Sequence, residues 1–194
     1  MMNFDPAQVT KLLRNRRSIF TKQFSGERVK DAFIQEMLEN ANWAPTYKKT
    51  EPWRFKVFCD EGLKKLGEMQ AEIYKKANGK KADDSTLKKL INKPQECSHV
   101  IAIGMKRDKS ITKIEEICAV AAAVQNMHLT ATALGVGCYW STGGITYLEE
   151  AKPYFDLGKK DLLLGFLYVG MPDLKKWPES KRKSIESKVT WVRE

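Results

Sequence analysis

Residues 114–134 constrain the fold most, because they read as one long helix with small or apolar side chains on every side. Glu115, Glu116 and His128 interrupt the segment, so it is too polar to cross a bilayer. At about 1.5 Å per residue the helix would make about six turns. In a chain of 194 residues it can pack against a sheet and still have one face left uncovered. That remaining face favours a dimer interface.

Hydrophobic periodicity predicts the other elements of the chain. We expect Asp5 to cap a first helix, with Pro6 in its first turn and its end near Asn15. Apolar residues at helical spacing predict two more helices, and short aromatic or β-branched runs predict strands. These helices cover residues 29–42 and 63–76, and the strands cover residues 54–59, 100–105 and 162–169. The polar segment 78–93 is predicted to be a mobile excursion.

The order of these elements indicates the fold class. Helices and strands mix without regular βαβ alternation, which favours α+β over a doubly wound sheet. No internal repeat is present, and the length suits one domain, so we expect a single domain over residues 1–194.

The formal charge of +10 comes mainly from lysine pairs dispersed along the chain. A dispersed lysine surface is usually a solvated face, and it can also attract anionic ligands. No aromatic residues interleave with the lysine pairs, and no DNA- or RNA-binding motif is present, so we expect no nucleic-acid partner. The sequence contains no secretory signal and no apolar window long enough to span a bilayer. We therefore expect a cytoplasmic protein without a membrane partner.

The four cysteines, Cys59, Cys97, Cys118 and Cys138, lie far apart in the sequence. Their spacing indicates neither a disulfide framework nor a zinc site, and we expect buried, reduced thiols. No Ser-His-Asp or Cys-His set is present to act as a nucleophile. We therefore assign no catalytic residue and no metal ligand.

Three turns are dense in hydrogen-bond donors. Arg16, Arg17 and Ser18 follow the first helix, and guanidinium groups match a phosphate bidentately. The loop from Asn42 to Trp53 presents hydroxyls, a phenol and two ammonium groups, and prolines fix its path. The third turn, from Trp140 to Gly144, has glycines that allow a close backbone approach. Each turn also has an ordinary interpretation, as a basic helix end, a solvated loop or a turn after a strand.

Four sequence blocks, taken in order, carry a family resemblance. They are R-R-S at Arg16 to Ser18, A-P-x-x-K-x-x-x-P-W-R-F at Ala44 to Phe55, A-A-A-V-Q-N-M-H-L-T-A-T-A-L-G at Ala121 to Gly135 leading into Y-W-S-T-G, and G-F-L-Y-V-G-M-P at Gly165 to Pro172. Arg182 lies beyond the last block. In this order and spacing the chain resembles the FMN-dependent nitroreductase family, most closely its small members with W-[RS]-[ST]-G after the long helix. The resemblance implies a mixed, mainly antiparallel sheet flanked by helices, in an intertwined homodimer with two flavins at its interface.

The resemblance assigns the three turns and Arg182 to the FMN. The residues carried over are Arg16, Arg17, Ser18 and Arg182 for the phosphate and ribityl chain, Pro45, Thr46, Tyr47, Lys48 and Lys49 for the ring and its polar edge, and Trp140, Ser141, Thr142 and Gly143 as a third wall against the ring. A lysine near the flavin N1 and C2 oxygen, such as Lys48, would stabilise the anionic reduced ring. Gly143 is expected to reject a large side chain, with added strain if its φ is positive.

The sequence departs from the family pattern at three positions. Many members have an asparagine where Lys49 stands, a glutamine where Glu51 stands and a basic residue where Phe20 stands. The phosphate site is therefore expected to hold its ligand with fewer charges than is common in the family.

The resemblance implies an NAD(P)H-oxidising reductase with a ping-pong cycle. Hydride would pass from NAD(P)H to FMN, and a nitroaromatic, quinone or activated alkene would then take the reducing equivalents. One alternative is a non-catalytic flavin-binding or redox-sensing protein on the same fold. Another is a basic nucleic-acid-binding module without flavin.

Overall fold

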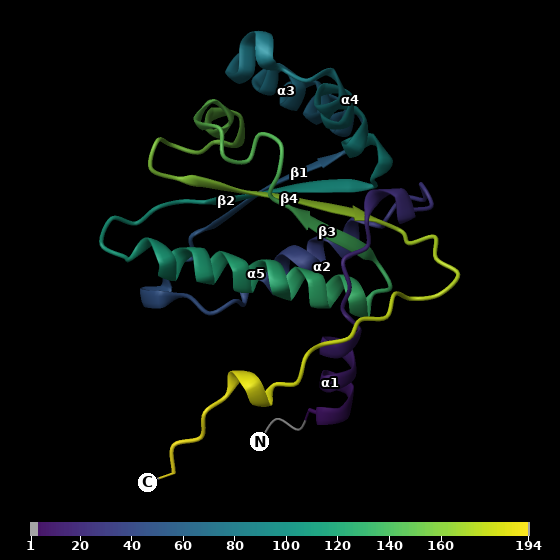
Figure 1. Ribbon diagram of the computed structural model, residues 1–194, viewed down its shortest axis with the longest axis vertical. Helices are drawn as coiled ribbons and strands as arrows, with labels where there is room; N and C mark the ends of the chain where they lie inside the picture. The colour runs from purple at the N-terminus through teal and green to yellow at the C-terminus, as the bar shows by residue number, and fades with distance from the viewer. Residues whose placement is uncertain (1–3, 194) are drawn as a thin grey trace.

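The computed structural model of the chain describes residues 4–193, and its core is an antiparallel sheet between two layers of helices (Figure 1). The helices are α1 (Pro6–Asn15), α2 (Asp31–Asn42), α3 (Glu61–Asn78), α4 (Asp84–Asn92) and α5 (Lys113–Ala133). The strands are β1 (Trp53–Cys59), β2 (His99–Met105), β3 (Gly137–Ser141) and β4 (Leu162–Gly170). Short 3₁₀ helices lie at Thr21–Gln23, Tyr47–Lys49, Gly79–Lys81, Lys93–Glu96, Glu149–Phe155 and Glu186–Lys188. Each predicted helix and strand is present, with its ends within two residues of the predicted ones.

The sheet has the strand order β1-β2-β4-β3, and every neighbouring pair is antiparallel. Trp53 on β1 pairs with Met105 on β2, and Tyr139 on β3 pairs with Tyr168 on β4. All seven residues of β2 are buried, because both faces of this inner strand are covered. The α+β class and the flanked, mainly antiparallel sheet are thus confirmed.

Side-chain alternation along β2 divides the core into two layers. Ile101, Ile103 and Met105 pack against α2 and α5 on one face of the sheet. Val100 and Ala102 pack on the other face, with α3 and the segment that includes the 3₁₀ helix Glu149–Phe155. Figure 1 shows these two groups of elements on opposite sides of the strands.

One side of α5 packs on the core and the other is uncovered within one chain. Val120, Val124 and Met127 are buried against the sheet and α2. Ile114, with 60% of its surface exposed, begins an open stripe along the helix. The stripe continues through Cys118, Ala121, Ala122, Gln125 and Leu129, which are exposed or half-buried. The expected free face of the long helix is therefore present, and no helix of the described residues could cross a membrane.

The expectation that all four cysteines are buried was wrong. Cys118 is exposed and Cys59 is half-buried, whereas Cys97 and Cys138 are buried as expected. The α5 helix turns Cys118 away from the sheet, which its apolar neighbours in the sequence could not indicate.

The segment 78–93 is not an irregular excursion, because it contains α4. The Asp83 carboxylate caps this helix by accepting a hydrogen bond from the Thr86 backbone N–H at 2.7 Å. Gly67 lets α4 approach α3 closely, since a Cβ on Gly67 would lie only 2.4 Å from the Ile91 carbonyl oxygen. Capping and this close approach order a helix that is polar over most of its surface.

Candidate functional site

The segment that follows α1 separates two cavities. Arg16 and Arg17 line one cavity, and Phe20, Thr21 and Lys22 line the other. Arg16 (φ −57°, ψ 125°) and Phe20 (φ −80°, ψ 157°) both have extended backbone. At about 3.3 Å per residue, the stretch between them spans about 13 Å. A ligand that follows this segment can place one end in each cavity.

The first of these, which we call the arginine cavity, has a volume of about 460 Å³. Its lining residues are Leu13, Arg14, Arg16, Arg17, Ser180 and Arg182. The fold thus brings Arg16 and Arg17 together with Arg182 from the C-terminal segment, as the resemblance implies. Arg14 and Ser180 were not predicted from the sequence, although each lies two residues from a predicted arginine.

Arg17 holds the backbone of the arginine cavity together. Its Nε donates to the Pro178 carbonyl oxygen at 2.7 Å, and one terminal nitrogen donates to the Arg14 carbonyl oxygen at 2.7 Å. These bonds connect the end of α1 to the C-terminal segment that carries Arg182. The Arg16 side chain, by contrast, makes no hydrogen bond within the described part of the chain, so its guanidinium is available to an anion.

A neutral buried pair lies behind Arg16. His128 Nδ1 is 3.1 Å from the Cys138 Sγ. Burial, and secondarily the charge of Arg16, lowers the pKa of His128 to about 4. Burial raises the pKa of Cys138 to about 12. Both groups are therefore uncharged near neutral pH, and neither offsets the positive charge of the arginine cavity.

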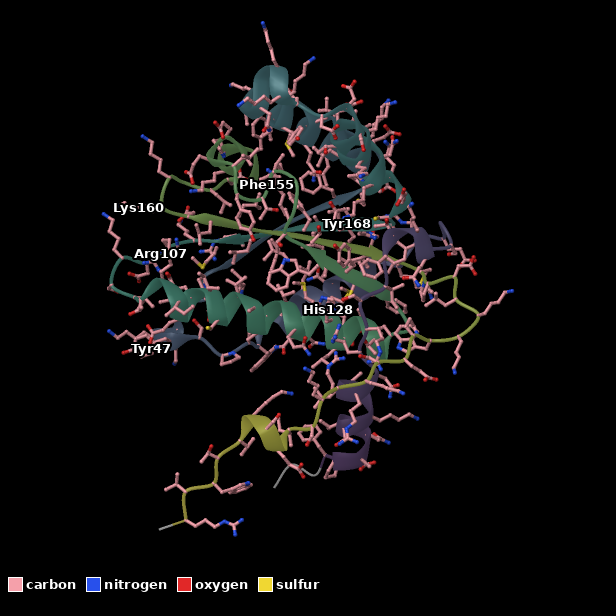
Figure 2. All side chains as sticks on the ribbon, in the orientation of Figure 1. Tyr47, Arg107, His128, Phe155, Lys160 and Tyr168 are labelled. Carbon is pink, nitrogen blue, oxygen red and sulfur yellow. The ribbon has the colours of Figure 1, made fainter. Side chains whose placement is uncertain are left out.

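The second cavity, which we call the lysine cavity, has a volume of about 650 Å³, within the usual range for small-molecule sites. Lys22, Lys88, Lys89 and Lys93 are the lysines of its lining. The cross-strand pair Tyr139 and Tyr168 is also part of it, with nearly parallel rings 6.2 Å apart. Figure 2 marks Tyr168 on the sheet, on the side that faces α4.

The deep end of the lysine cavity presents hydrogen-bond donors. Lys93 Nζ lies 4.8 Å from the Tyr139 ring centre and 4.2 Å from that of Tyr168. Lys93 is half-buried, and this burial lowers its pKa. Gln70 is only 1% exposed, and its Nε2 has no partner among the described residues. A ligand with carbonyl oxygens or a negative edge would satisfy both groups.

Lys93 and Gln70 were not predicted. Gln70 follows Leu66 and precedes Ile73 at helical spacing, which places a polar amide on the buried side of α3. Lys93 directly precedes Pro94 and lies six residues before the buried strand β2, so a lysine here can be drawn toward the sheet. These were the available signals, but neither one specifies which cavity the side chain reaches.

The predicted third turn is divided between a strand and a loop. Trp140 and Ser141 end β3 rather than forming the turn, and Trp140 Nε1 donates to the Leu164 carbonyl oxygen at 3.0 Å. The Trp140 ring packs against the α2–α5 side of the sheet. Ser141 and Gly143 line the lysine cavity, whereas Trp140 and Thr142 do not.

The positive φ that was considered for Gly143 is found at Gly144 instead. Gly143 has no positive φ, and a Cβ there would meet no atom within 4 Å. Gly144 has φ +68°, and its Cβ would lie 2.9 Å from Leu90 Cδ2 on α4. The left-handed backbone and the contact with α4 therefore both select glycine at Gly144.

The loop that carries Pro45, Thr46, Tyr47, Lys48 and Lys49 lies away from both cavities. Figure 2 shows Tyr47 near the amino-terminal end of α5 and His128 toward its other end. With 21 residues, α5 is about 31 Å long. No small ligand can touch the loop and the two cavities within one chain.

The same loop is closed on itself by local hydrogen bonds. The Thr46 and Thr50 hydroxyls are 3.0 Å apart, and the Glu51 N–H donates to Thr46 Oγ1 at 3.2 Å. Lys48, Lys49 and Glu51 have positive φ values of 50°, 54° and 43°. Asparagine tolerates this backbone region better than lysine does, which gives a physical reason for the asparagine that is common at the position of Lys49.

Comparisons with known proteins agree with this geometry. The family model described as the nitroreductase family matches residues 13–171. The protein named "Putative NAD(P)H nitroreductase YfhC" of Bacillus subtilis is 30% identical over 178 residues, which cover 89% of this chain and 88% of the relative.

Solved structures give the same fold. A nitroreductase-like family protein from Bacillus cereus superimposes with a TM-score of 0.84 and 27% identity over the full length of both chains. The FMN-dependent nitroreductase NfnB from Mycobacterium smegmatis, solved in complex with NADPH, has a TM-score of 0.73 and 16% identity over 97% of this chain and 100% of its own. At that identity the second likeness concerns the fold alone.

Proposed function

Because the chain belongs to the nitroreductase family, we propose that it is an FMN-dependent oxidoreductase that oxidises NAD(P)H and reduces an electron-poor small molecule. The observation that carries the proposal is the pair of cavities joined by the extended segment from Arg16 to Phe20. One cavity suits a phosphate, and the other suits a ring with polar edges. FMN has both groups, connected by a ribityl chain.

Arg16 and Arg182 would hold the FMN phosphate in the arginine cavity, with help from Arg14 and Ser180. Ser18 is exposed and lines neither cavity, so its role toward the ribityl chain rests on the resemblance alone. Arg16 is the best placed of these, because its guanidinium is free of other hydrogen bonds in the described residues. Arg17 has a positioning role, since it keeps the C-terminal segment beside α1. The Cys138 thiol behind Arg16 stays neutral, so it adds no negative charge that would weaken the attraction for a dianion.

Lys93 and Gln70 would hold the polar edge of the ring in the lysine cavity. The Gln70 amide is a buried donor that needs an acceptor, which the pyrimidine carbonyl oxygens provide. The Lys93 ammonium would stabilise negative charge on that edge, the role that the sequence suggested for Lys48. Ser141 and the Gly143–Gly144 backbone would close the side of the ring. When bound, FMN would supply the group that accepts a hydride from NAD(P)H and donates it to the acceptor.

We also propose that two chains form each complete site. The loop from Pro45 to Lys49 lies at the amino-terminal end of α5, which is about 31 Å long, and the cavities lie toward the other end, so the loop can reach a ring only in another copy. A two-fold axis near the middle of α5 would pair the open stripes of two helices in opposite directions. This arrangement would bring the loop of each chain toward the cavities of its partner, in the homodimer expected from the sequence.

The first experiment tests the proposal as a whole. The purified protein should be yellow with an FMN absorption spectrum, and it should consume NAD(P)H steadily when a nitroaromatic or a quinone is added. A colourless protein that does not bind added FMN would refute the proposal. Bound FMN without any NAD(P)H oxidation would favour the flavin-binding or sensor alternative instead.

The second experiment tests the assignment of the phosphate. Arg16→Ala should weaken FMN binding by about 1.5–3 kcal/mol, the usual value for a charge-assisted hydrogen bond, as measured by FMN fluorescence titration of the apoprotein. Lys11→Ala is the matched control, because it removes an exposed positive charge from the same helix without lining the cavity. Equal FMN affinity in the two variants would remove Arg16 from the phosphate site.

A further inference from the structure

The mouth of the lysine cavity carries an unbalanced positive charge. Lys22, Lys88 and Lys89 line it and are exposed. Among the described lining residues, Glu96 is the single carboxylate, and its Oε2 accepts a hydrogen bond from the Thr21 hydroxyl. The lining thus carries four lysines against one carboxylate, so the charge at the mouth is strongly positive.

An exposed aromatic ring stands beside these lysines. Phe20 is 52% exposed, and its ring centre lies 4.7 Å from that of Tyr139 at a tilt of 54°. A phenylalanine with half of its surface open at a cavity mouth offers an apolar face on which a planar ligand can stack. It cannot hold a phosphate, unlike the basic residue common at this position in the resembled family.

Helix α4, which carries Lys88 and Lys89, lies against the turn at Gly144. Leu90, next to Lys89, contacts Gly144, whose φ of +68° turns the chain beneath the helix. Lys88 and Lys89 line the cavity together with Ser141 and Gly143 of this turn. With Lys93 at the deep end assigned to the cofactor edge, these outer lysines remain for a second ligand.

We propose that the lysine cavity selects planar aromatic acceptors that carry a carboxylate over neutral and cationic acceptors of the same shape. The aromatic part would stack against Phe20, and the carboxylate would pair with Lys88, Lys89 and Lys22. This inference rests on the proposed function, because it concerns the acceptor of that reaction. It concerns the outer lysines only, so it can fail while the proposed function stands.

Binding to the FMN-loaded protein is measured with three probes that cannot be reduced, namely benzoate, benzamide and benzyltrimethylammonium. Isothermal calorimetry at low ionic strength should give the tightest binding for benzoate and the weakest for the cation. Salt near physiological ionic strength should reduce the preference for benzoate, because the Debye length falls to about 8 Å. Equal affinities for benzoate and benzamide would overturn the inference.

Charge substitution then locates the selectivity. In the double variant Lys88→Gln, Lys89→Gln, the ratio of benzamide to benzoate dissociation constants should fall about fivefold, as expected for the loss of two exposed ion pairs. The matched control is Lys64→Gln, Lys65→Gln on α3, which removes the same charge from exposed residues that do not line the cavity. An equal fall in both double variants, or in neither, would overturn the assignment to α4.

Turnover separates this inference from the proposed function. The ratio of kcat/KM for 4-nitrobenzoate to that for 4-nitrobenzamide should fall about fivefold in the α4 double variant, in parallel with binding. A change in the KM for NADPH alone, with both ratios unchanged, would mean that the lysines contact the nicotinamide dinucleotide and would overturn the inference. Absence of bound FMN, or of turnover with 4-nitrobenzamide, would instead refute the proposed function. If the double variant does not fold, the salt dependence of the unaltered protein decides the question.

Discussion

Mild acid should destabilise the protein through His128, before its carboxylates become protonated. His128 is 6% exposed, and burial followed by the charge of Arg16 lowers its pKa from 6.5 to about 4 in the folded chain. The folded state therefore favours the neutral ring, whereas the unfolded chain binds a proton near pH 6.5. The resulting stability is fully present above about pH 6.5 and is lost as the pH falls toward 4.

The pKa difference sets the size of this effect. Each unit of pKa difference corresponds to 1.36 kcal/mol, so the fall from 6.5 to about 4 corresponds to about 3.4 kcal/mol of unfolding free energy. The full amount is lost only when the pH is below both pKa values. At pH 5 the unfolded chain is almost fully protonated at this ring and the folded chain is not, which gives a loss of about 2 kcal/mol relative to pH 7.5. A typical domain has about 5–15 kcal/mol of total stability, so this loss is readily measured.

Urea unfolding of the apoprotein at pH 7.5, 6.5, 5.5 and 5.0, at one protein concentration, measures the effect through tryptophan fluorescence. The variant His128→Gln should lose most of the pH dependence, even if it is less stable overall. The control is His99→Gln, because burial also lowers the pKa of His99, but the hydrogen bond that the His99 ring donates to the Asp31 carboxylate opposes the shift. If His128→Gln keeps the full 2 kcal/mol dependence, His128 is not the titrating group and the neutral pair with Cys138 is wrongly assigned.

Three further predictions each test one feature by substitution. Gly144→Val should destabilise the protein by about 1–2 kcal/mol and weaken FMN binding, because φ is positive there, whereas Gly143→Val should cost less. Thermal unfolding and FMN titration compare the two, and equal effects would contradict the assignment of the turn. Lys49→Asn should raise the free energy of unfolding by roughly 0.5–1 kcal/mol in a denaturant titration, since asparagine accepts φ of 54° more readily, and no gain would mean that this backbone is unstrained. Ala122→Glu, on the open stripe of α5, should convert the proposed dimer to a monomer in light scattering, and a dimer mass for both the variant and the unaltered protein would exclude this stripe as the interface.

The elements with strong periodicity could be predicted from the sequence, and those that depend on partners in space could not. The residue patterns of α5, β2 and β4 were sufficient to predict these elements, because burial imposes a regular spacing on their apolar residues. Helix α4 was missed since polar residues outnumber apolar ones, although Leu87, Leu90 and Ile91 have helical spacing and Asp83 is a typical cap. Such weak helical signals are not decisive in a single sequence, because the helix that packs against the segment is unknown.

The residues of the candidate site could be grouped from the sequence only where the family resemblance links them. Arg16, Arg17 and Arg182 meet in one cavity, and the resemblance had joined them. Sequence order could not indicate that Lys93 reaches the tyrosine pair, because this depends on where α4 ends above the sheet. Nor could it indicate that the loop around Lys48 lies at the far end of α5, since the motif is the same whether the loop acts within its own chain or on a second one.

The limited burial of α4 has a consequence for the kinetics of the lysine cavity. None of its nine residues is buried, and it rests on the protein mainly through Leu90 over Gly144 and Ile91 over Gly67. A helix attached this way opens at a lower free energy than the sheet does, so its amide hydrogens should exchange with solvent through local opening rather than through global unfolding. Because Lys88 and Lys89 move with the helix, the same opening would release a bound acceptor and would set its residence time.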